Sequence, residues 1–218
     1  SKGNLYRRTA PMGEETVTAR DLAGNILRKT DAKGVTTKYT YDSFNRLTSV
    51  ETGITAQRTE GDLTSYAYNE NGSLVSITDP QNNMTTFEYN SLEQLTKKTT
   101  HLGQVTLFTY DPNGNVKTET DPNGNVKTFT YNDSDELIQK ILPDNAYAMN
   151  YDDFGNLLSV SDEDSVLEYS YEKIRGKYVV TQAKSSGTDL PSVTLNYGYD
   201  DFGNRTSMGT PFGGFSYS

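Results

Sequence analysis

The chain has 218 residues, a formal net charge of −9 and only 33% hydrophobic residues, which is few for a domain built around one thick core. The acidic balance argues against nucleic acid or an anionic membrane as a partner, because both bind basic surfaces. The absence of cysteine excludes disulfides and thiolate metal ligands. The sequence also contains no apolar run long enough to predict insertion into a membrane. The composition predicts a chain that buries a thin layer of side chains.

Tyrosines recur along the chain at a nearly fixed spacing. Successive intervals are 27, 21, 21, 21, 20, 20 and 28 residues, so insertions are expected near residues 51–62 and 173–191. A constant period of this length indicates a repeat array, here over residues 1–218 without a domain boundary. The repeat tyrosines are Tyr41, Tyr68, Tyr89, Tyr110, Tyr131, Tyr151, Tyr171 and Tyr199.

Each repeat tyrosine is predicted to end a strand. A second bulky residue lies two positions before it, and alternate residues of a strand face the same side of a sheet. Each repeat therefore places two large side chains on one face. In chain order the second bulky residues are Tyr39, Tyr66, Phe87, Phe108, Phe129, Met149, Tyr169 and Tyr197.

A turn is predicted after each tyrosine, with a residue of left-handed backbone at its fourth position. Glycine, which adopts that conformation without strain, stands there as Gly72, Gly114, Gly155 and Gly203. Asn45 and Asp135 replace it in two copies and tolerate the conformation better than most residues. Glu93 and Arg175 do not, so their turns are expected to differ in shape.

The segments Asp111–Gly114 and Asp121–Gly124 both read Asp-Pro-Asn-Gly and predict type I turns followed by a left-handed glycine. Each repeat thus holds two short strands and two turns. The predicted fold class is all-β, made of repetitive antiparallel hairpins that form a curved or spiralling sheet.

Both ends of the chain read as parts of a repeat, so we expect a slice of a longer protein. Residues 1–5 match the half-repeat that follows a tyrosine, and residues 215–217 match the next strand. Exposed strand edges invite pairing with another chain. Lys2, Arg7 and Arg8 would oppose this at one end, whereas residues 212–218 carry no charge, so edge-to-edge self-association is expected at the C-terminal end.

These residues carry a resemblance to a known family. The pattern Tyr-Asp, two residues, Gly-Asn and an aliphatic residue, followed by Asp-x-x-Gly and aromatic-x-Tyr, resembles the YD or RHS repeat. It is matched at Tyr110-Asp111, at Tyr151 to Leu157 and at Tyr199 to Arg205. The family includes bacterial Rhs polymorphic toxins, the C components of Tc toxins, wall-associated proteins of Gram-positive bacteria and the teneurins.

The resemblance implies a secreted or cell-surface protein whose strands form a segment of a hollow β-shell. It implies, as partners, the remainder of the same shell and an encapsulated C-terminal toxin domain. The alternative from another class is a cell-surface adhesion or carbohydrate-binding tube. The repeat aromatics accordingly have two interpretations, since they either pack the sheet together or form a platform for cell-surface glycans.

The residues that could carry chemistry predict neither catalysis nor a metal or cofactor. His101 is the only histidine and replaces a turn residue, with no carboxylate beside it in the sequence to orient it. The acidic clusters at 152–153, 162–164 and 200–201 lack the spacing of a calcium loop and predict turn caps. Rhs proteins end their shell with a self-cleaving Asp-Pro-x-Gly motif, but both copies here lie inside ordinary repeats and are predicted to be turns.

Overall fold

The computed structural model describes residues 4–9, 15–188, 191–210 and 213–216. All regular secondary structure in these ranges is β-strand, and the strand pairs are antiparallel. The predicted all-β fold of repeated hairpins is therefore confirmed. Within the same ranges, no helix is long and apolar enough to cross a membrane.

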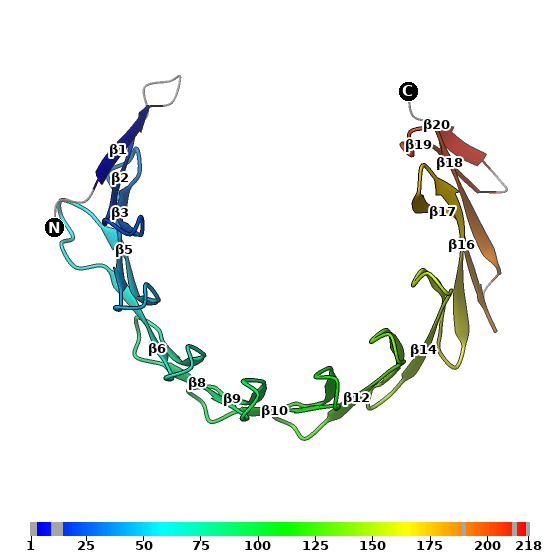
Figure 1. Ribbon diagram of the computed structural model, residues 1–218, viewed down its shortest axis with the longest axis horizontal. Coiled ribbons are helices and arrows are strands. Elements are labelled where there is room, and N and C mark those ends of the chain that lie inside the picture. Colours follow the sequence, from blue (N-terminus) through cyan, green and yellow to red (C-terminus); the bar gives the residue numbers. More distant parts are fainter. Residues whose placement is uncertain (1–3, 10–14, 189–190, 211–212, 217–218) are drawn as a thin grey trace. The chain divides into compact units, whose positions relative to one another are not determined.

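The chain forms two compact units, residues 1–106 and residues 107–218. In each unit a strand pairs with the next strand in sequence, and the sheet curves (Figure 1). The N-terminal unit contains β1 (Asn4–Thr9), β2 (Glu15–Arg20), β3 (Ile26–Thr30), β4 (Thr36–Tyr41), β5 (Leu47–Ile54), β6 (Asp62–Tyr68), β7 (Leu74–Thr78), β8 (Met84–Tyr89) and β9 (Leu95–Thr99). The C-terminal unit, with the two residues before it, contains β10 (Val105–Tyr110), β11 (Val116–Thr120), β12 (Val126–Tyr131), β13 (Leu137–Ile141), β14 (Ala146–Tyr151), β15 (Leu157–Ser161), β16 (Ser165–Ile174), β17 (Lys177–Gly187), β18 (Val193–Tyr199), β19 (Arg205–Thr210) and β20 (Gly213–Ser216).

The two faces of the sheet differ in chemistry, as the alternation predicts. Phe129 and Tyr131 of β12 are half-buried, whereas Thr130 between them is exposed. Directly opposed residues on exposed positions form ion pairs, such as Lys97 to Glu88 at 2.8 Å. Exposed pairs of this kind contribute little each, roughly 0.2 to 1 kcal/mol. The aromatic face is thus the one that the sheet buries in part.

The buried layer is thin. Among the residues that the structure describes, only Thr36, Ile54 and Ala183 are buried, and Thr36 is the most completely enclosed. Thr36 and Ile54 pair across β4 and β5, beside the first insertion, where the Arg58 guanidinium binds the Asp62 carboxylate at 2.7 Å. The composition therefore predicted the depth of the core correctly.

The strand that contains each repeat tyrosine carries a bulge at that tyrosine, and all but β16 end there. The register between β12 and β13 shifts between Thr130 and Tyr131, so that Tyr131 pairs with Leu137. The same shift occurs in β2, between Ala19 and Arg20, where Arg20 pairs with Ile26. Arg20 thus occupies a repeat position, which the spacing of tyrosines alone did not reveal.

The second insertion lengthens a hairpin. β16 and β17 continue past Tyr171 and remain paired to Ile174 and Lys177. Arg175 and Gly176 form the connection, with φ of 49° and 85°, the positive pair that a two-residue hairpin turn requires. The expectation that the Arg175 turn differs from the others is confirmed.

The predicted left-handed positions are confirmed, with φ of 97° at Gly72, 96° at Gly114, 80° at Gly155 and 83° at Gly203. Asn45 and Asp135 take the same conformation, at 61° and 60°. The expectation for Glu93 is wrong. Its φ is 58°, and its turn has the hydrogen bonds of the others, including Glu93 N–H to the Asn90 carbonyl at 3.1 Å.

Part of the expected self-association surface lies outside the described residues. This applies to Lys2 and to residues 212, 217 and 218. Arg7 and Arg8 lie in β1, which pairs with β2. Edge-to-edge association stays a prediction.

Candidate functional site

Most of the repeat tyrosines join one hairpin to the next through their hydroxyl groups. The pairing between β11 and β12 stops at Thr118 and Thr128. Tyr131 lies three residues beyond Thr128, and its hydroxyl donates to the carbonyl of Val116, two residues before Thr118, at 3.2 Å. The side chain therefore supplies a hydrogen bond to the strand pair at the point where the backbone bonds end.

The same two spacings recur in both units. In each case the tyrosine lies three residues beyond the last backbone pair of its own strand, and the acceptor carbonyl lies two residues before that pair on the neighbouring strand. The bonds are Tyr68 to Leu47 at 2.8 Å, Tyr89 to Leu74 at 2.8 Å, Tyr151 to Leu137 at 3.1 Å, Tyr171 to Leu157 at 2.9 Å and Tyr199 to Val180 at 2.9 Å.

Burial raises the pKa of four repeat tyrosines. It raises the pKa of Tyr131, with a smaller contribution from the negative charge of Asp111. Burial also raises the pKa of Tyr41, Tyr110 and Tyr171. A neutral phenol can donate its proton to a carbonyl, and a phenolate cannot. The pKa shifts therefore agree with a structural use of the hydroxyl.

The turns that follow the tyrosines are closed by their own first residue. In the turn 152–156, the Asp152 carboxylate accepts from the backbone N–H of Phe154 and of Asn156, at 2.9 Å each. The Asn156 side-chain amide adds a bond of 2.8 Å and is the largest cause of the lowered pKa of Asp152. Asp162 and Asp200 bind their turns in the same manner. The acidic clusters therefore cap turns, as predicted.

Three of the non-glycine residues in the left-handed position, Asn45, Glu93 and Asp135, join neighbouring turns through hydrogen bonds. The Glu93 carboxylate accepts from Asn69 at 3.2 Å, from Asn71 at 2.5 Å and from the Ser73 hydroxyl. The bond from Ser73 is the largest cause of the lowered pKa of Glu93, and those from Asn71 and Asn69 add to it. They explain why glutamate accepts a backbone conformation that costs about 1 kcal/mol or more in a non-glycine residue.

The other two cases follow the same rule. Asp135 accepts from the side-chain amides of Asn113, at 3.0 Å, and Asn115, at 2.6 Å. Asn45 accepts from Asn25 at 2.8 Å. In all three, the strained residue of one turn binds an asparagine of the turn that lies one repeat earlier.

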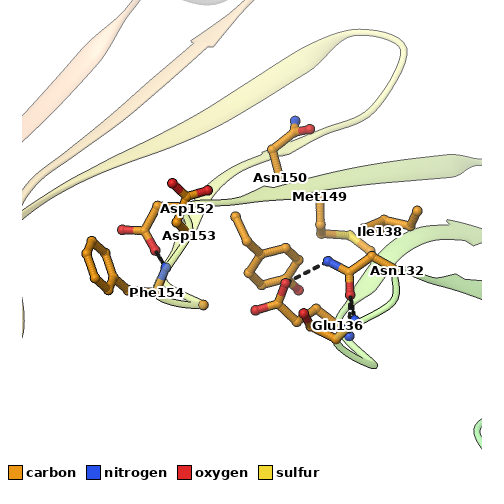
Figure 2. Close-up of a pocket in the computed structure, with 11 residues that line it drawn as sticks. Asn132, Glu136, Ile138, Met149, Asn150, Asp152, Asp153 and Phe154 are labelled. Atoms are coloured by element: carbon orange, nitrogen blue, oxygen red, sulfur yellow. Dashed lines mark hydrogen bonds between the residues drawn. The ribbon is translucent and has the colours of Figure 1, made fainter.

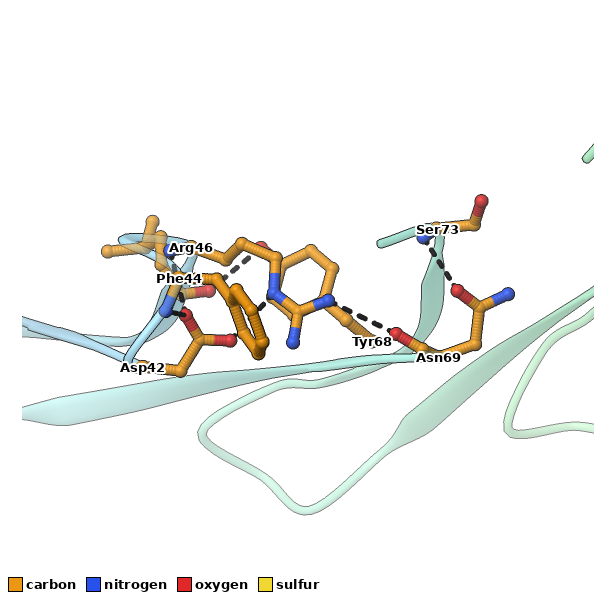
Figure 3. A network of polar contacts seen from close by, with 7 residues as sticks. Asp42, Phe44, Arg46, Tyr68, Asn69 and Ser73 are labelled. Carbon is orange, nitrogen blue, oxygen red and sulfur yellow. Dashed lines mark hydrogen bonds and ion pairs between the residues drawn. The ribbon is translucent and has the colours of Figure 1, made fainter. Parts of the chain in front are cut away.

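Where the left-handed residue is glycine, as in the turn 69–73, the connecting side chain comes from the turn one repeat earlier. Arg46 forms an ion pair with Asp42 at 2.7 Å and donates to the Asn69 carbonyl at 3.1 Å, in the turn that contains Gly72 (Figure 3). Its guanidinium also lies 4.9 Å from the centre of the Tyr68 ring, within cation–π range. The long side chain passes from one turn to the next.

A pocket of about 670 Å³ lies between the turns 132–136 and 152–156 (Figure 2). Its wall combines carboxylates with aromatic and amide groups, including Glu136, Asp152, Tyr151 and Asn132. The Asn132 amide donates to Glu136 at 2.7 Å. Phe154 stands at the rim and is 71% exposed, although its ring lies 5.1 Å from that of Tyr178.

The extended hairpin of β16 and β17 occupies the place of one repeat turn. Tyr178 contacts Phe154 of the preceding turn, and the Arg175 guanidinium lies 4.2 Å from the Phe202 ring of the following turn. The longer hairpin therefore contacts both the turn 152–156 and the turn 200–204. Neither contact was predicted from the sequence.

His101 lies in the exposed turn 100–104, as predicted. The pKa of Asp79 is lowered, chiefly by the hydrogen bond from the Asn83 amide and least by the charge of His101, an influence that the sequence did not reveal. That carboxylate is occupied by the amide and backbone N–H of Asn83, at 2.9 and 2.8 Å. It is thus committed to its own turn. Across the described ranges, no group of three or more acidic or histidine side chains could hold a metal ion.

Comparison with known proteins identifies relatives of this arrangement. A family model described as the teneurin YD-shell matches residues 16–208. A comparison with curated proteins gave no match. The family model therefore covers both units, including the turn that follows Arg20.

Solved structures share the fold at low sequence identity. A crystal structure of TcdB2-TccC3 matches with a TM-score of 0.77 and 21% identity over 96% of this chain. A TcdB2-TccC3-Cdc42 structure gives 0.76 and 20% over 94%. The Tc holotoxin pore of Photorhabdus luminescens gives 0.54 and 16% over 97%. This chain spans only 12%, 12% and 16% of those chains.

Proposed function

Because this chain belongs to the teneurin YD-shell family, we propose that it is a wall segment of a shell that encloses a C-terminal toxin domain, in a secreted or cell-surface protein. The proposal assigns the chain a structural role without catalysis. Its direct partners would be the remainder of the same shell and the enclosed domain.

The observation that carries the wall function is the use of the repeat tyrosines. Each hydroxyl described above binds a backbone carbonyl of the neighbouring strand, and each ring is half-buried. Side chains used in this way stabilise the sheet and leave few polar groups of the aromatic face for a ligand. Enclosure is supported by a matched structure described as TcdB2-TccC3 without hypervariable C-terminal region, since this shows that one relative carries such a region.

Protease protection in the full-length protein tests the enclosure. The parent gene is first sequenced beyond the codon for Ser218, and the C-terminal region is then expressed alone and within the whole protein. We expect the region to resist protease only within the whole protein, and to lose that protection when the shell is opened by denaturant. Equal digestion of both forms would contradict enclosure.

A second candidate function, carbohydrate binding, is favoured by the pocket between the turns 132–136 and 152–156. Carboxylates and amides beside an exposed aromatic ring suit the hydroxyl groups and apolar face of a sugar. Glycan-array binding by the chain, lost in Phe154→Ala but kept in Phe202→Ala, would support it. Phe202 is a matched control because it holds the same turn position and is 69% exposed.

A further inference from the structure

The chain contains three Asn-Gly dipeptides, all in exposed turns: Asn71-Gly72, Asn113-Gly114 and Asn123-Gly124. This dipeptide is prone to a spontaneous reaction, because glycine has no side chain to shield its backbone nitrogen. The glycine nitrogen attacks the asparagine side-chain carbonyl carbon, a C–N bond forms, and ammonia leaves. Water then opens the cyclic imide to aspartate or isoaspartate.

The backbone of the three turns is the same. Each glycine has left-handed φ, at 97°, 96° and 85°. Each glycine N–H also donates to the carbonyl of the first turn residue, over 3.1, 3.1 and 3.0 Å. Any restraint that the backbone places on the attacking nitrogen is therefore common to all three dipeptides.

The side-chain amides differ. The Asn71 amide donates to Glu93, and the Asn113 amide donates to Asp135. Within the described part of the chain, the amide of Asn123 has no hydrogen-bond partner. Attack requires the side chain to rotate over the glycine nitrogen, and a bond to a carboxylate opposes this rotation because charge-assisted bonds are the stronger ones.

We infer that Asn123-Gly124 is a site of spontaneous deamidation in the folded protein, and that Glu93 and Asp135 protect the other two dipeptides. The product at Asn123 gains a negative charge beside Asp121. In the isoaspartate form it also gains a backbone methylene, which the turn cannot accommodate without changing shape.

The chain provides its own control, because residues 111–118 and 121–128 have the same sequence, DPNGNVKT. Cleavage after Lys98, Lys117 and Lys127 separates Asn113 and Asn123 onto different peptides. The folded chain is incubated at neutral to mildly alkaline pH, and deamidation is followed by mass spectrometry with fragmentation. We expect Asn123 to react severalfold faster than Asn113, and the two rates to converge in urea. Equal rates in the folded chain would overturn the inference.

Substitution of Asp135 separates protection by the carboxylate from other causes. Asp135→Gly removes the acceptor and suits the left-handed φ of 60°, as glycine does in the equivalent turns. We expect the rate at Asn113 to rise to that at Asn123. Asp135→Asn keeps an acceptor oxygen and should retain most of the protection. An unchanged rate in Asp135→Gly would refute the role of Asp135.

The dipeptide in the N-terminal unit gives an independent test. Glu93→Gly should accelerate deamidation at Asn71 severalfold and leave Asn123 unaffected. Thermal melts confirm that each variant is folded before its rates are compared. If both glycine variants fold and neither changes its paired asparagine, side-chain anchoring is not the cause.

Discussion

Residues 111–118 and 121–128 have identical sequences but different surroundings. Both form the same turn, in which the first residue N–H binds the fifth residue carbonyl at 2.9 Å. They differ in what attaches to them. Val116 accepts the Tyr131 hydroxyl and Asn113 binds Asp135, whereas Val126 is 45% exposed. The turn is therefore determined locally, whereas the hydrogen bonds between repeats depend on residues some 15 to 22 positions away.

The largest effect should come from removing the attachment that only the first segment has. Tyr131→Ala deletes a half-buried ring and the bond to Val116, and we expect a loss of about 2 to 4 kcal/mol in the free energy of unfolding. Tyr131→Phe removes the hydroxyl alone and should cost about 1 kcal/mol. Urea denaturation measures both. No loss in Tyr131→Ala would mean that the tyrosine is a surface group.

A smaller effect is expected when the feature common to both segments is altered. Gly124 has φ of 85° and open space around the position of an added Cβ. Gly124→Ala should therefore cost about 1 to 2 kcal/mol from backbone strain alone. Its melting curve is compared with that of Asn123→Ala, which leaves the glycine in place. A neutral Gly124→Ala would show that the turn tolerates another conformation.

Acid should weaken the two segments alike. The Asn125 amide is the main cause of the lowered pKa of Asp121, with desolvation opposing it and backbone N–H groups adding to it. A depressed pKa in the folded state stabilises the fold above the ordinary value of 3.8, and this contribution is lost as pH falls through the folded pKa. Melting temperature should be level near neutrality and fall below about pH 4. Asp121→Asn, which imitates the turns that begin with asparagine, should reduce this acid dependence.

The smallest effect is expected in a related turn. His101 stands where Pro122 stands in the second segment, and it is exposed. His101→Ala should change stability by less than about 0.5 kcal/mol. Thermal melts of this variant and of Pro122→Ala are compared, which distinguishes an effect of the histidine side chain from an effect of any substitution at this turn position. A larger loss for His101→Ala would point to a role in holding Asp79.

The sequence predicted the parts of this fold that depend on nearby residues. Strand alternation and the left-handed glycines each follow from a few adjacent positions, and the structure has them. The Glu93 turn was predicted wrongly because its strain is compensated by Asn69, Asn71 and Ser73, which lie 20 to 24 residues away. The spacing of tyrosines did not predict the repeat at Arg20, because arginine occupies the tyrosine position there.

The candidate site was predicted less completely than the fold. The sequence identifies the repeat tyrosines but allows two roles for them, packing of the sheet or binding of a ligand. Which carbonyl accepts each hydroxyl depends on where the backbone pairing of two neighbouring strands ends. The sequence contains no direct signal for the last paired residue. The bridge from Arg175 to Phe202 likewise depends on the length of a hairpin whose boundaries were only approximate.

The constant offset of the tyrosine bond has a consequence for how such a gene can change. Every tyrosine–carbonyl bond described here uses the same two positions relative to the last backbone pair. A duplicated repeat therefore brings its own donor and acceptor, and a deleted repeat removes one of each. Recombination between equivalent positions of two repeats, such as the codons for Tyr110 and Tyr131, would alter the number of hairpins while each new junction keeps its hydrogen bond. Such an array can vary in length by whole repeats without the evolution of new contacts.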